Sequence, residues 1–321
     1  MGAPSPPACR ARHRVSVLGV GAMGRLHARV FHQLEGEFAL AGVYDPDAAV
    51  AGEVAEAWSA RAYPSEQEAI AAADLVVVAS PIESHAGAVR RAIAEGRHVL
   101  VEKPVCATAG QAFALARALR SGQRLFVGHS ERWNPAVRAL RRLVAPADIV
   151  TLRVRRTAPA LRPMREHGAL VSLGVHDLDL IAYLTRSPVA VRTVAHVDDD
   201  RADLVLTSAS GAVAWLHVDR RAPQRERSLE VTTRDFVYSA DLLTPSLDVT
   251  PRDGGPVRPC PLVTEEPLAA QARAIGRVLA SPEGPCEVAT GVDGARALLL
   301  VEQAMILGSR GALRGDLVEA S

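Results

Sequence analysis

The first 130 residues alternate between short apolar runs and longer stretches in which apolar positions follow a helical period. The apolar runs are rich in β-branched residues and predict buried strands at 14–19, 38–44, 75–80, 98–101 and 124–129. The longer stretches predict helices at 25–34, 46–59, 84–95 and 109–121. Strands that alternate with helices are typical of a parallel sheet covered on both faces. We therefore predict a doubly wound α/β domain over residues 13–130, preceded by a disordered tail at 1–12.

Beyond residue 130 the pattern changes to strands in which polar and apolar residues alternate. These are predicted at 149–156, 191–197, 204–208, 212–218, 228–233 and 236–240, with tight turns at Ser210-Gly211 and Arg234-Asp235. Helices are predicted at 172–185, 268–280 and 294–308, and the Pro-, Gly- and Asp-rich stretch 244–267 is predicted to be loop. We predict a second α/β domain over residues 131–321, with an open, mainly antiparallel sheet and C-terminal helices able to pack back on the first domain.

Composition is that of a globular protein of 321 residues, with 48% hydrophobic and 23% charged residues. The formal net charge of +1 gives no electrostatic reason to expect a nucleic-acid or membrane partner. No apolar stretch reaches the roughly 20 residues that span a bilayer, and the first residues lack the apolar centre of a secretion signal. The four cysteines show no C-x-x-C spacing, so we expect incidental thiols, no metal site and a cytoplasmic protein.

Two residue types each occur once in the chain. Of the 37 lysine and arginine residues only Lys103 is a lysine, and Asn134 is the single asparagine. This bias suggests a genome rich in G and C, in which arginine replaces lysine wherever the physics allows. The two positions are therefore candidates for chemistry that the common residues cannot perform.

A glycine motif follows the first predicted strand directly. In Gly19-Val-Gly21-Ala22-Met23-Gly24 the first glycine permits a tight turn, the second lets the backbone approach a pyrophosphate and the third permits close helix packing. The amides at the start of the next helix then face the diphosphate. The motif alone is a weak signal, because other nucleotide-binding proteins share glycine-rich turns, but its position between a strand and a helix predicts a dinucleotide site.

Asp45 ends the second predicted strand, about 20 residues beyond the motif, where a carboxylate accepts hydrogen bonds from the adenosine ribose and repels a 2′-phosphate. It favours NAD over NADP, unless Asp45 only starts the turn before Pro46. Ser80 and Pro81 lie at the same edge of the sheet, where ligands bind in open α/β folds. His85, at the start of the next helix, either packs or caps there, which we slightly favour, or faces the cofactor.

Further motifs follow in order: Glu102-Lys103-Pro104, Gly128-His-Ser-Glu-Arg-Trp-Asn-Pro135, Gly174-Val-His176-Asp-Leu-Asp179, Glu266-Pro-Leu268 and Gly291-Val-Asp-Gly294. Together with the glycine motif the chain resembles the glucose-fructose oxidoreductase/inositol dehydrogenase (Gfo/Idh/MocA) family from about Val15 to Val318. The resemblance implies a Rossmann domain, and a second domain whose open sheet joins subunits into a homodimer or homotetramer. It also implies hydride transfer between a nicotinamide and a secondary alcohol of a sugar, cyclitol or nucleotide sugar. The predicted cofactor-binding residues are Gly19, Gly21, Ala22, Met23, Gly24, Asp45, Ser80, Pro81, His85, Glu102 and Lys103.

Lys103 matches the family's catalytic lysine, beside the reacting hydroxyl. An alcohol that loses hydride must also lose a proton, and a lysine whose pKa is lowered can accept it, whereas arginine stays protonated. His176 matches the family's catalytic histidine, which relays the proton or bonds the alcohol; a packed core histidine is the alternative. Asp179, three residues on, either orients the imidazole and contacts substrate or has a helix-surface or capping role.

The chain departs from the family pattern at Ser172, where many members carry an aspartate four residues before the histidine. Serine cannot supply the charge that raises the basicity of His176. Three outcomes are open: Lys103 and His176 suffice, with Ser172 contacting substrate; another carboxylate substitutes; or catalysis is weak or absent. We favour the first, because the lysine and the histidine are both present.

Within the family, the run 131–135 and the segment 155–159 look most like nucleotide-sugar 3-dehydrogenases of the UDP-N-acetylglucosamine type. Guanidinium groups suited to a diphosphate are offered by Arg132, Arg155, Arg156 and Arg162. Each of these arginines could equally be solvated. Asn134 either bonds a sugar hydroxyl or starts a turn, and the basic stretch 220–227 is predicted to be solvated surface in a hairpin loop.

Three functions therefore compete. The first is an NAD-dependent dehydrogenase that acts on a ring hydroxyl, at C3 of a nucleotide sugar in a sugar-tailoring pathway. The second is a dehydrogenase of a free sugar or cyclitol. The third is a catalytically silent member that senses a dinucleotide and regulates another protein, for which Ser172 is the sole support and which Lys103 and His176 oppose.

Overall fold

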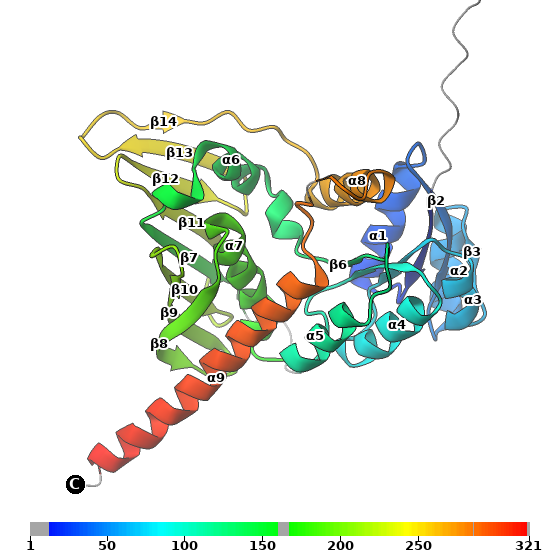
Figure 1. Ribbon diagram of the computed structural model, residues 1–321, viewed down its shortest axis with the longest axis horizontal. Helices are drawn as coiled ribbons and strands as arrows, with labels where there is room; N and C mark the ends of the chain where they lie inside the picture. Colours follow the sequence, from blue (N-terminus) through cyan, green and yellow to red (C-terminus); the bar gives the residue numbers. More distant parts are fainter. Residues whose placement is uncertain (1–12, 160–166, 285, 320–321) are drawn as a thin grey trace, which may run out of the picture.

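The computed structural model describes residues 13–159, 167–284 and 286–319. The expected tail at 1–12 and Arg162 lie outside the described residues. Two sheets, each with its own helices, lie side by side (Figure 1). This confirms the predicted fold class: a parallel Rossmann sheet and a second, mainly antiparallel α/β sheet.

The first sheet is parallel, with the strand order β3-β2-β1-β4-β5-β6. Its strands are β1 (His13–Leu18), β2 (Phe38–Tyr44), β3 (Arg61–Ala62), β4 (Leu75–Val78), β5 (His98–Val101) and β6 (Leu125–Val127). The crossing helices are α1 (Ala22–Gln33), α2 (Ala48–Ala57), α3 (Glu66–Ala71), α4 (Ile82–Ala94) and α5 (Ala109–Arg117). The strand order reverses direction between β1 and β4, and ligands of doubly wound sheets bind at such a point.

The second sheet has the order β14-β13-β12-β11-β7-β10-β9-β8, in which β7 and β10 are parallel and the other neighbours antiparallel. Its strands are β7 (Thr151–Thr157), β8 (Val189–Val197), β9 (Arg201–Ser208), β10 (Val213–Asp219), β11 (Glu226–Thr232), β12 (Phe236–Asp241), β13 (Ser246–Pro251) and β14 (Arg258–Pro259). The prediction of loop over 244–267 is wrong for β13 and β14. β13 pairs with β12 and buries Leu247, so tertiary contacts override a composition that disfavours strands.

Helices cover one face of the second sheet and connect it to the first (Figure 1). They are η1 (Ser130–Trp133), α6 (Pro135–Leu143), η2 (Pro146–Asp148), the π-helical turn η3 (Leu170–Gly174) that runs into α7 (Val175–Thr185), α8 (Pro267–Ala280) and α9 (Gly291–Glu319). α8 packs against α1, and α9 packs against both α5 and β8, so the C-terminal helices contact both sheets. Within the described residues no helix is both long and apolar enough to cross a membrane.

The two faces of the first sheet and the inner face of the second are each covered by an apolar cluster. The strands β4 and β6 of the first sheet are wholly buried, because helices cover both faces of the sheet there. Strands of the second sheet alternate, and in β7 the side chains of Leu152 and Val154 are buried while those of Arg153 and Arg155 are exposed. The outer face of the second sheet is therefore uncovered, and it carries charged side chains together with apolar ones such as Trp215 and Leu243.

Candidate active site

The glycine motif forms the turn between β1 and α1. Gly19 has φ +81°, and a Cβ there would lie 2.5 Å from the Ser80 Cα, so both conformation and space require glycine. A Cβ on Gly24 would lie 1.9 Å from the carbonyl oxygen of Gly19, which lets α1 pack closely on the turn. Gly21 differs, because nothing lies within 4 Å of its missing Cβ. That open space is where a bound group can approach the backbone.

A cavity of about 530 Å³ opens in front of this turn, lined by Gly19, Gly21, Asp45, Ser80 and Pro81 among others. Gly21 caps α1 without any side-chain hydrogen bond, so the first amides of the helix, at Ala22 and Met23, are left for an anion. Asp45 accepts hydrogen bonds from the amides of Val20 (2.9 Å) and Asp47 (3.0 Å), which fixes its carboxylate at the cavity. The open space at Gly21, the amides at the start of α1 and the carboxylate of Asp45 fit a dinucleotide.

His85 lies beside this cavity and not in it. Its ring is 1% exposed, with Nδ1 2.9 Å from the carbonyl oxygen of Pro104 and Nε2 2.7 Å from that of Ser80. It therefore connects the loop after β4 to the loop after β5. Contact between His85 and a cofactor stays a prediction, and the structure gives the imidazole the packing position that the sequence slightly favours.

Lys103 and Glu102 follow β5 at the same edge of the sheet. Glu102 is buried, accepts a hydrogen bond from His27 Nε2 (2.7 Å), and sits so close to Gly128 that a Cβ there would lie 2.8 Å from its carboxyl group. The Lys103 amine donates to the backbone carbonyl of Ser172 (2.8 Å). Burial lowers the pKa of Lys103, Glu102 raises it, and Arg156 and Arg227 lower it, with a net decrease from the ordinary value.

His176 stands on the first turn of α7, close to Lys103. Burial lowers its pKa well below 6.5, and the positive charges of Lys103 and Arg156 lower it further, so the imidazole is neutral. Its Nδ1 is buried and has no hydrogen-bond partner among the described residues. The ring of His129 meets it edge to face, with 5.8 Å between the ring centroids. The Ser172 hydroxyl donates a hydrogen bond to the carbonyl of Gly168 (3.1 Å), and not to Lys103 or His176.

Ion pairs surround this centre. Arg156 holds Asp177 with two hydrogen bonds (2.7 and 2.8 Å) and donates a third to Glu131 (3.1 Å), and all three residues are buried. Arg227 also donates to Glu131 (2.9 Å). The prediction that 220–227 is solvated surface is therefore wrong for Arg227, because the antiparallel pairing of β11 with β7 brings it beside Arg156.

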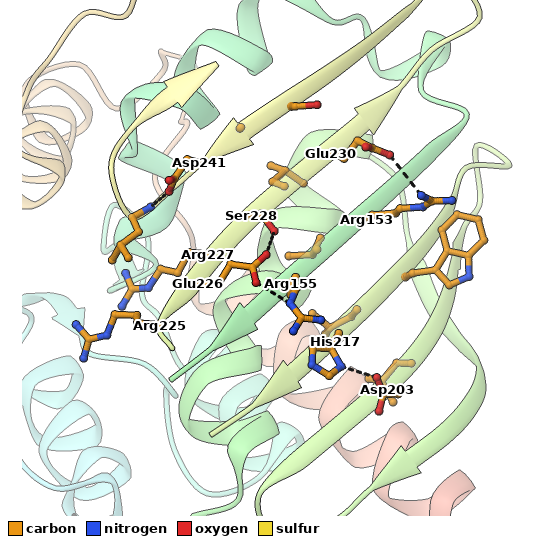
Figure 2. A pocket seen from close by; sticks show the side chains of 18 of the residues that line it. Arg153, Arg155, Asp203, His217, Arg225, Glu226, Arg227, Ser228, Glu230 and Asp241 are labelled. Carbon is orange, nitrogen blue, oxygen red and sulfur yellow. Dashed lines mark hydrogen bonds and ion pairs between the residues drawn. The ribbon is translucent and has the colours of Figure 1, made fainter. Parts of the chain in front are cut away.

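The remaining predicted substrate ligands occupy three different places. Arg132 and Asp179 form a buried ion pair, in which Nε and Nη2 of the arginine donate to the two carboxylate oxygens at 2.7 and 2.6 Å. Asn134 is buried, caps α6 and donates to the carbonyl of Leu242 (2.9 Å). Arg155 points to the outer face of the second sheet, where it pairs with Glu226 (Figure 2). Substrate binding by these residues stays a prediction, and the structure does not bring Arg155 or Asn134 to Lys103.

Comparison with known proteins assigns both domains of the chain to one protein family. The family model for the Gfo/Idh/MocA oxidoreductases with their NAD-binding Rossmann fold matches residues 13–129, and the model of the family's C-terminal domain matches residues 138–235. The chain belongs to the Gfo/Idh/MocA oxidoreductase family. The predictions of an oxidoreductase and of an NAD-binding Rossmann domain are thereby confirmed.

Relatives of this Gfo/Idh/MocA protein include two curated dehydrogenases. It is 34% identical to UDP-N-acetylglucosamine 3-dehydrogenase of Acidithiobacillus ferrooxidans, over 79% of this chain and 82% of that protein. It is 27% identical to inositol 2-dehydrogenase of Rhizobium meliloti, over 91% and 96%. A solved structure of the Acidithiobacillus enzyme matches with a TM-score of 0.84 at 29% identity, covering 92% of this chain and 98% of that one.

Four residues that the structure places around Lys103 and His176 were not singled out from the sequence: His129, Glu131, Asp177 and Arg227. His129 and Glu131 lie in the run that carries the family resemblance, and Asp177 is next to His176, so their position in the motifs was an available signal. Arg227 offered none, because only the pairing of β11 with β7 brings it to Glu131.

Proposed function

We propose that the protein oxidises a secondary ring hydroxyl of a sugar with NAD as hydride acceptor, at C3 of a nucleotide sugar, or catalyses the reverse reduction. The observation that carries the proposal is the single lysine of the chain, held at the sheet edge by the Ser172 carbonyl with His176 nearby. The likeness to UDP-N-acetylglucosamine 3-dehydrogenase over most of both chains supports the substrate class.

In the proposed reaction Lys103 accepts the hydroxyl proton. Bound NAD supplies the site for the hydride. The carbonyl of Ser172 aims the amine without stabilising its ammonium form as a carboxylate would, so a lone pair is available at a pH below the usual lysine range. His176, neutral and beside the amine, is placed to hydrogen-bond the substrate oxygen or to take the proton onward.

We further propose that residues 13–130 bind the cofactor and residues 131–321 the substrate. Asp45 supports NAD over NADP, because a carboxylate at the end of β2 repels a 2′-phosphate and accepts from ribose hydroxyls. The cavity at the glycine turn is also lined by Ser80 and Pro81. The amides of Ala22 and Met23 lie at the start of α1, directly after Gly21 in the same lining. Three free thiols, on Cys106, Cys260 and Cys286, support a reducing compartment, the cytoplasm.

The open face of the second sheet supports a homodimer or homotetramer. Charged residues stand in pairs along it, including Arg155–Glu226 (2.7 Å) and His217–Asp203 (2.6 Å) (Figure 2). Trp215, 40% exposed, lies under the Arg153 guanidinium. A second copy that covers this face would bury the indole, so Trp215→Glu should dissociate the assembly in light scattering. Unchanged mass would argue for another interface.

A substrate panel tests the function. Purified protein with NAD is given UDP-N-acetylglucosamine, other UDP-sugars, unactivated sugars and inositols, and NADH absorbance is followed. We expect turnover with the UDP-sugars. The 27% identity to inositol 2-dehydrogenase over 91% of the chain favours inositols as the second candidate. Turnover only with inositols would support that candidate, and NAD binding with no turnover on any compound would support the silent sensor.

A further inference from the structure

His129 is a buried titratable residue that the proposed reaction does not use. It follows β6, is 1% exposed, and its Nδ1 has no hydrogen-bond partner within the described part of the chain. An unpaired ring nitrogen in a protein interior costs stability, so its presence in a folded protein calls for an explanation. Its ring contacts that of His176, whose Nδ1 is buried and unpaired as well.

On its other side His129 approaches a carboxylate. Its Nδ1 lies 3.9 Å from Asp179 Oδ2, too far for a hydrogen bond but close enough for a small ring rotation to form one. Burial raises the pKa of Asp179, and the ion pair with Arg132 outweighs it, so the pKa lies below the ordinary value and Asp179 is ionised. His176 and Asp179 stand three residues apart on α7 and share a face, with His129 reaching both.

Beyond Asp179 lies a second cavity, of about 600 Å³, beside the C-terminal half of α7. Its lining includes Asp179, Arg132 and Asp293, but neither Lys103 nor His176. The Asp293 side chain lies 3.7 Å from Arg132 and is 29% exposed. The polar groups that begin at Asp179 therefore continue through Arg132 to a residue that reaches solvent. The buried groups therefore form a row from the reacting centre to water that avoids the cofactor cavity.

We propose that His129 is a positioning residue that carries the substrate's proton from His176 towards Asp179 and this second cavity. The inference rests on the proposed function. Each turnover breaks the C–H bond, whose electron pair leaves with the hydride, and the O–H bond, whose proton must leave the site. The proton passes from Lys103 or the substrate oxygen to His176, then to His129, and then to Asp179, which lines the second cavity and releases the proton to water there. Both rings return to the neutral state and Asp179 to the ionised state.

The electrostatic surroundings of His129 fit a transient carrier. Burial lowers its pKa, Asp179 raises it, Arg132 and Lys103 lower it, and Asp293 raises it. The net result is a lowered pKa, so the ring is neutral at rest and quickly releases a proton that it has accepted. The charged and titratable groups that face it are Asp179, Arg132, Lys103, Asp293 and His176.

The test separates hydride transfer from proton release. Stopped-flow absorbance of NADH and of a pH-indicator dye in weak buffer is recorded for wild type, His129→Phe and His129→Gln, with the sugar that the panel identifies. His196→Gln on β8, whose imidazole pairs with Asp198 at the surface, is the matched control. Thermal unfolding checks that the variants fold.

We expect NADH and proton to appear together in the wild type and in the control. In both His129 variants the proton should lag behind the first NADH, kcat should fall roughly tenfold, and imidazole in the buffer should restore it, with NAD affinity unchanged. Simultaneous release of proton and NADH in a folded His129 variant would overturn the inference while leaving the proposed function intact. A wild type without turnover on the panel contradicts the proposed function and the inference together.

Discussion

The amine of Lys103 donates a hydrogen bond to the backbone carbonyl of Ser172 at 2.8 Å. This contact joins the loop after β5 of the first sheet to the π-helical turn that precedes α7 of the second. The acceptor is a neutral backbone carbonyl, and the side chain of residue 172 is a serine, which brings no negative charge to the amine. The contact orients the amine, whereas a carboxylate would also raise its pKa.

Replacement of Lys103 by arginine should remove turnover and preserve the fold. Arginine keeps the positive charge but cannot give up its proton, so kcat should fall about 10²- to 10⁴-fold while NAD binding persists. NADH formation and NAD fluorescence titration measure the two effects. Arg142→Lys, an exchange of the same two residue types at an exposed site on α6, should change neither. Full activity of Lys103→Arg would exclude Lys103 as the base.

The lowered pKa of Lys103 also predicts how stability depends on pH. At pH values between the folded-state pKa of Lys103 and the ordinary value of 10.5, this residue binds more protons in the unfolded chain than in the folded chain. Its contribution to the free energy of unfolding therefore rises with pH over that range. Lys103→Met lacks this contribution. The difference in unfolding free energy, wild type minus variant, should therefore grow from neutral pH towards 10.5, as urea titrations at several pH values can measure. A flat difference would contradict the lowered pKa.

Ser172→Asp should move the pH profile of catalysis. A carboxylate near the amine favours the ammonium form, so the pH at which kcat/KM reaches half its maximum should rise. Ser172→Ala removes the hydroxyl that donates to Gly168 without adding charge and serves as the control. If the aspartate variant keeps the wild-type midpoint, its carboxylate does not act on Lys103.

Asp45→Ser should weaken NAD binding and improve the use of NADP. The loss of a charge-assisted hydrogen bond to ribose corresponds to about 1.5–3 kcal/mol, or roughly a 10- to 100-fold higher KM for NAD. Removal of the negative charge relieves repulsion of a 2′-phosphate. Asp47→Ser, the same exchange two residues on at the cap of α2, is the control. An unchanged ratio of NAD to NADP activity would remove Asp45 from the cofactor site.

Removal of one partner of the buried Arg156–Asp177 ion pair should strongly reduce the stability of the protein. Asp177→Ala leaves a buried guanidinium with one of its carboxylates missing, which should reduce the free energy of unfolding by about 3–5 kcal/mol. The double variant Arg156→Met/Asp177→Leu removes both charges and should be less destabilised than the single variant. Denaturant unfolding compares the two. Equal losses would show that the charges themselves contribute little.

Periodicity predicted the strands and helices of the first sheet well, because its strands are short β-branched runs and its helices are long. It missed α3 and α6, each fewer than ten residues long, and the strand β13, which forms through its pairing with β12 on one side and β14 on the other. The candidate site residues that the sequence predicts, such as Gly19, Asp45 and Lys103, follow strands of a parallel sheet. The carboxyl ends of such strands meet at one edge whatever the loops do.

Local periodicity and residue type were enough to predict the parallel sheet, the glycine turn at Gly19–Gly24 and the single lysine at the same edge of the sheet. Which of two neighbouring arginines faces inward depended instead on strand pairing: Arg156 is buried against Asp177, whereas Arg155 is exposed on the outer face. Neighbouring residues in a strand point to opposite faces, and the pairing of β7 with β10 and β11 fixes which face is covered. Packing between the two sheets likewise brought His129 between His176 and Asp179, contacts that no local pattern encodes.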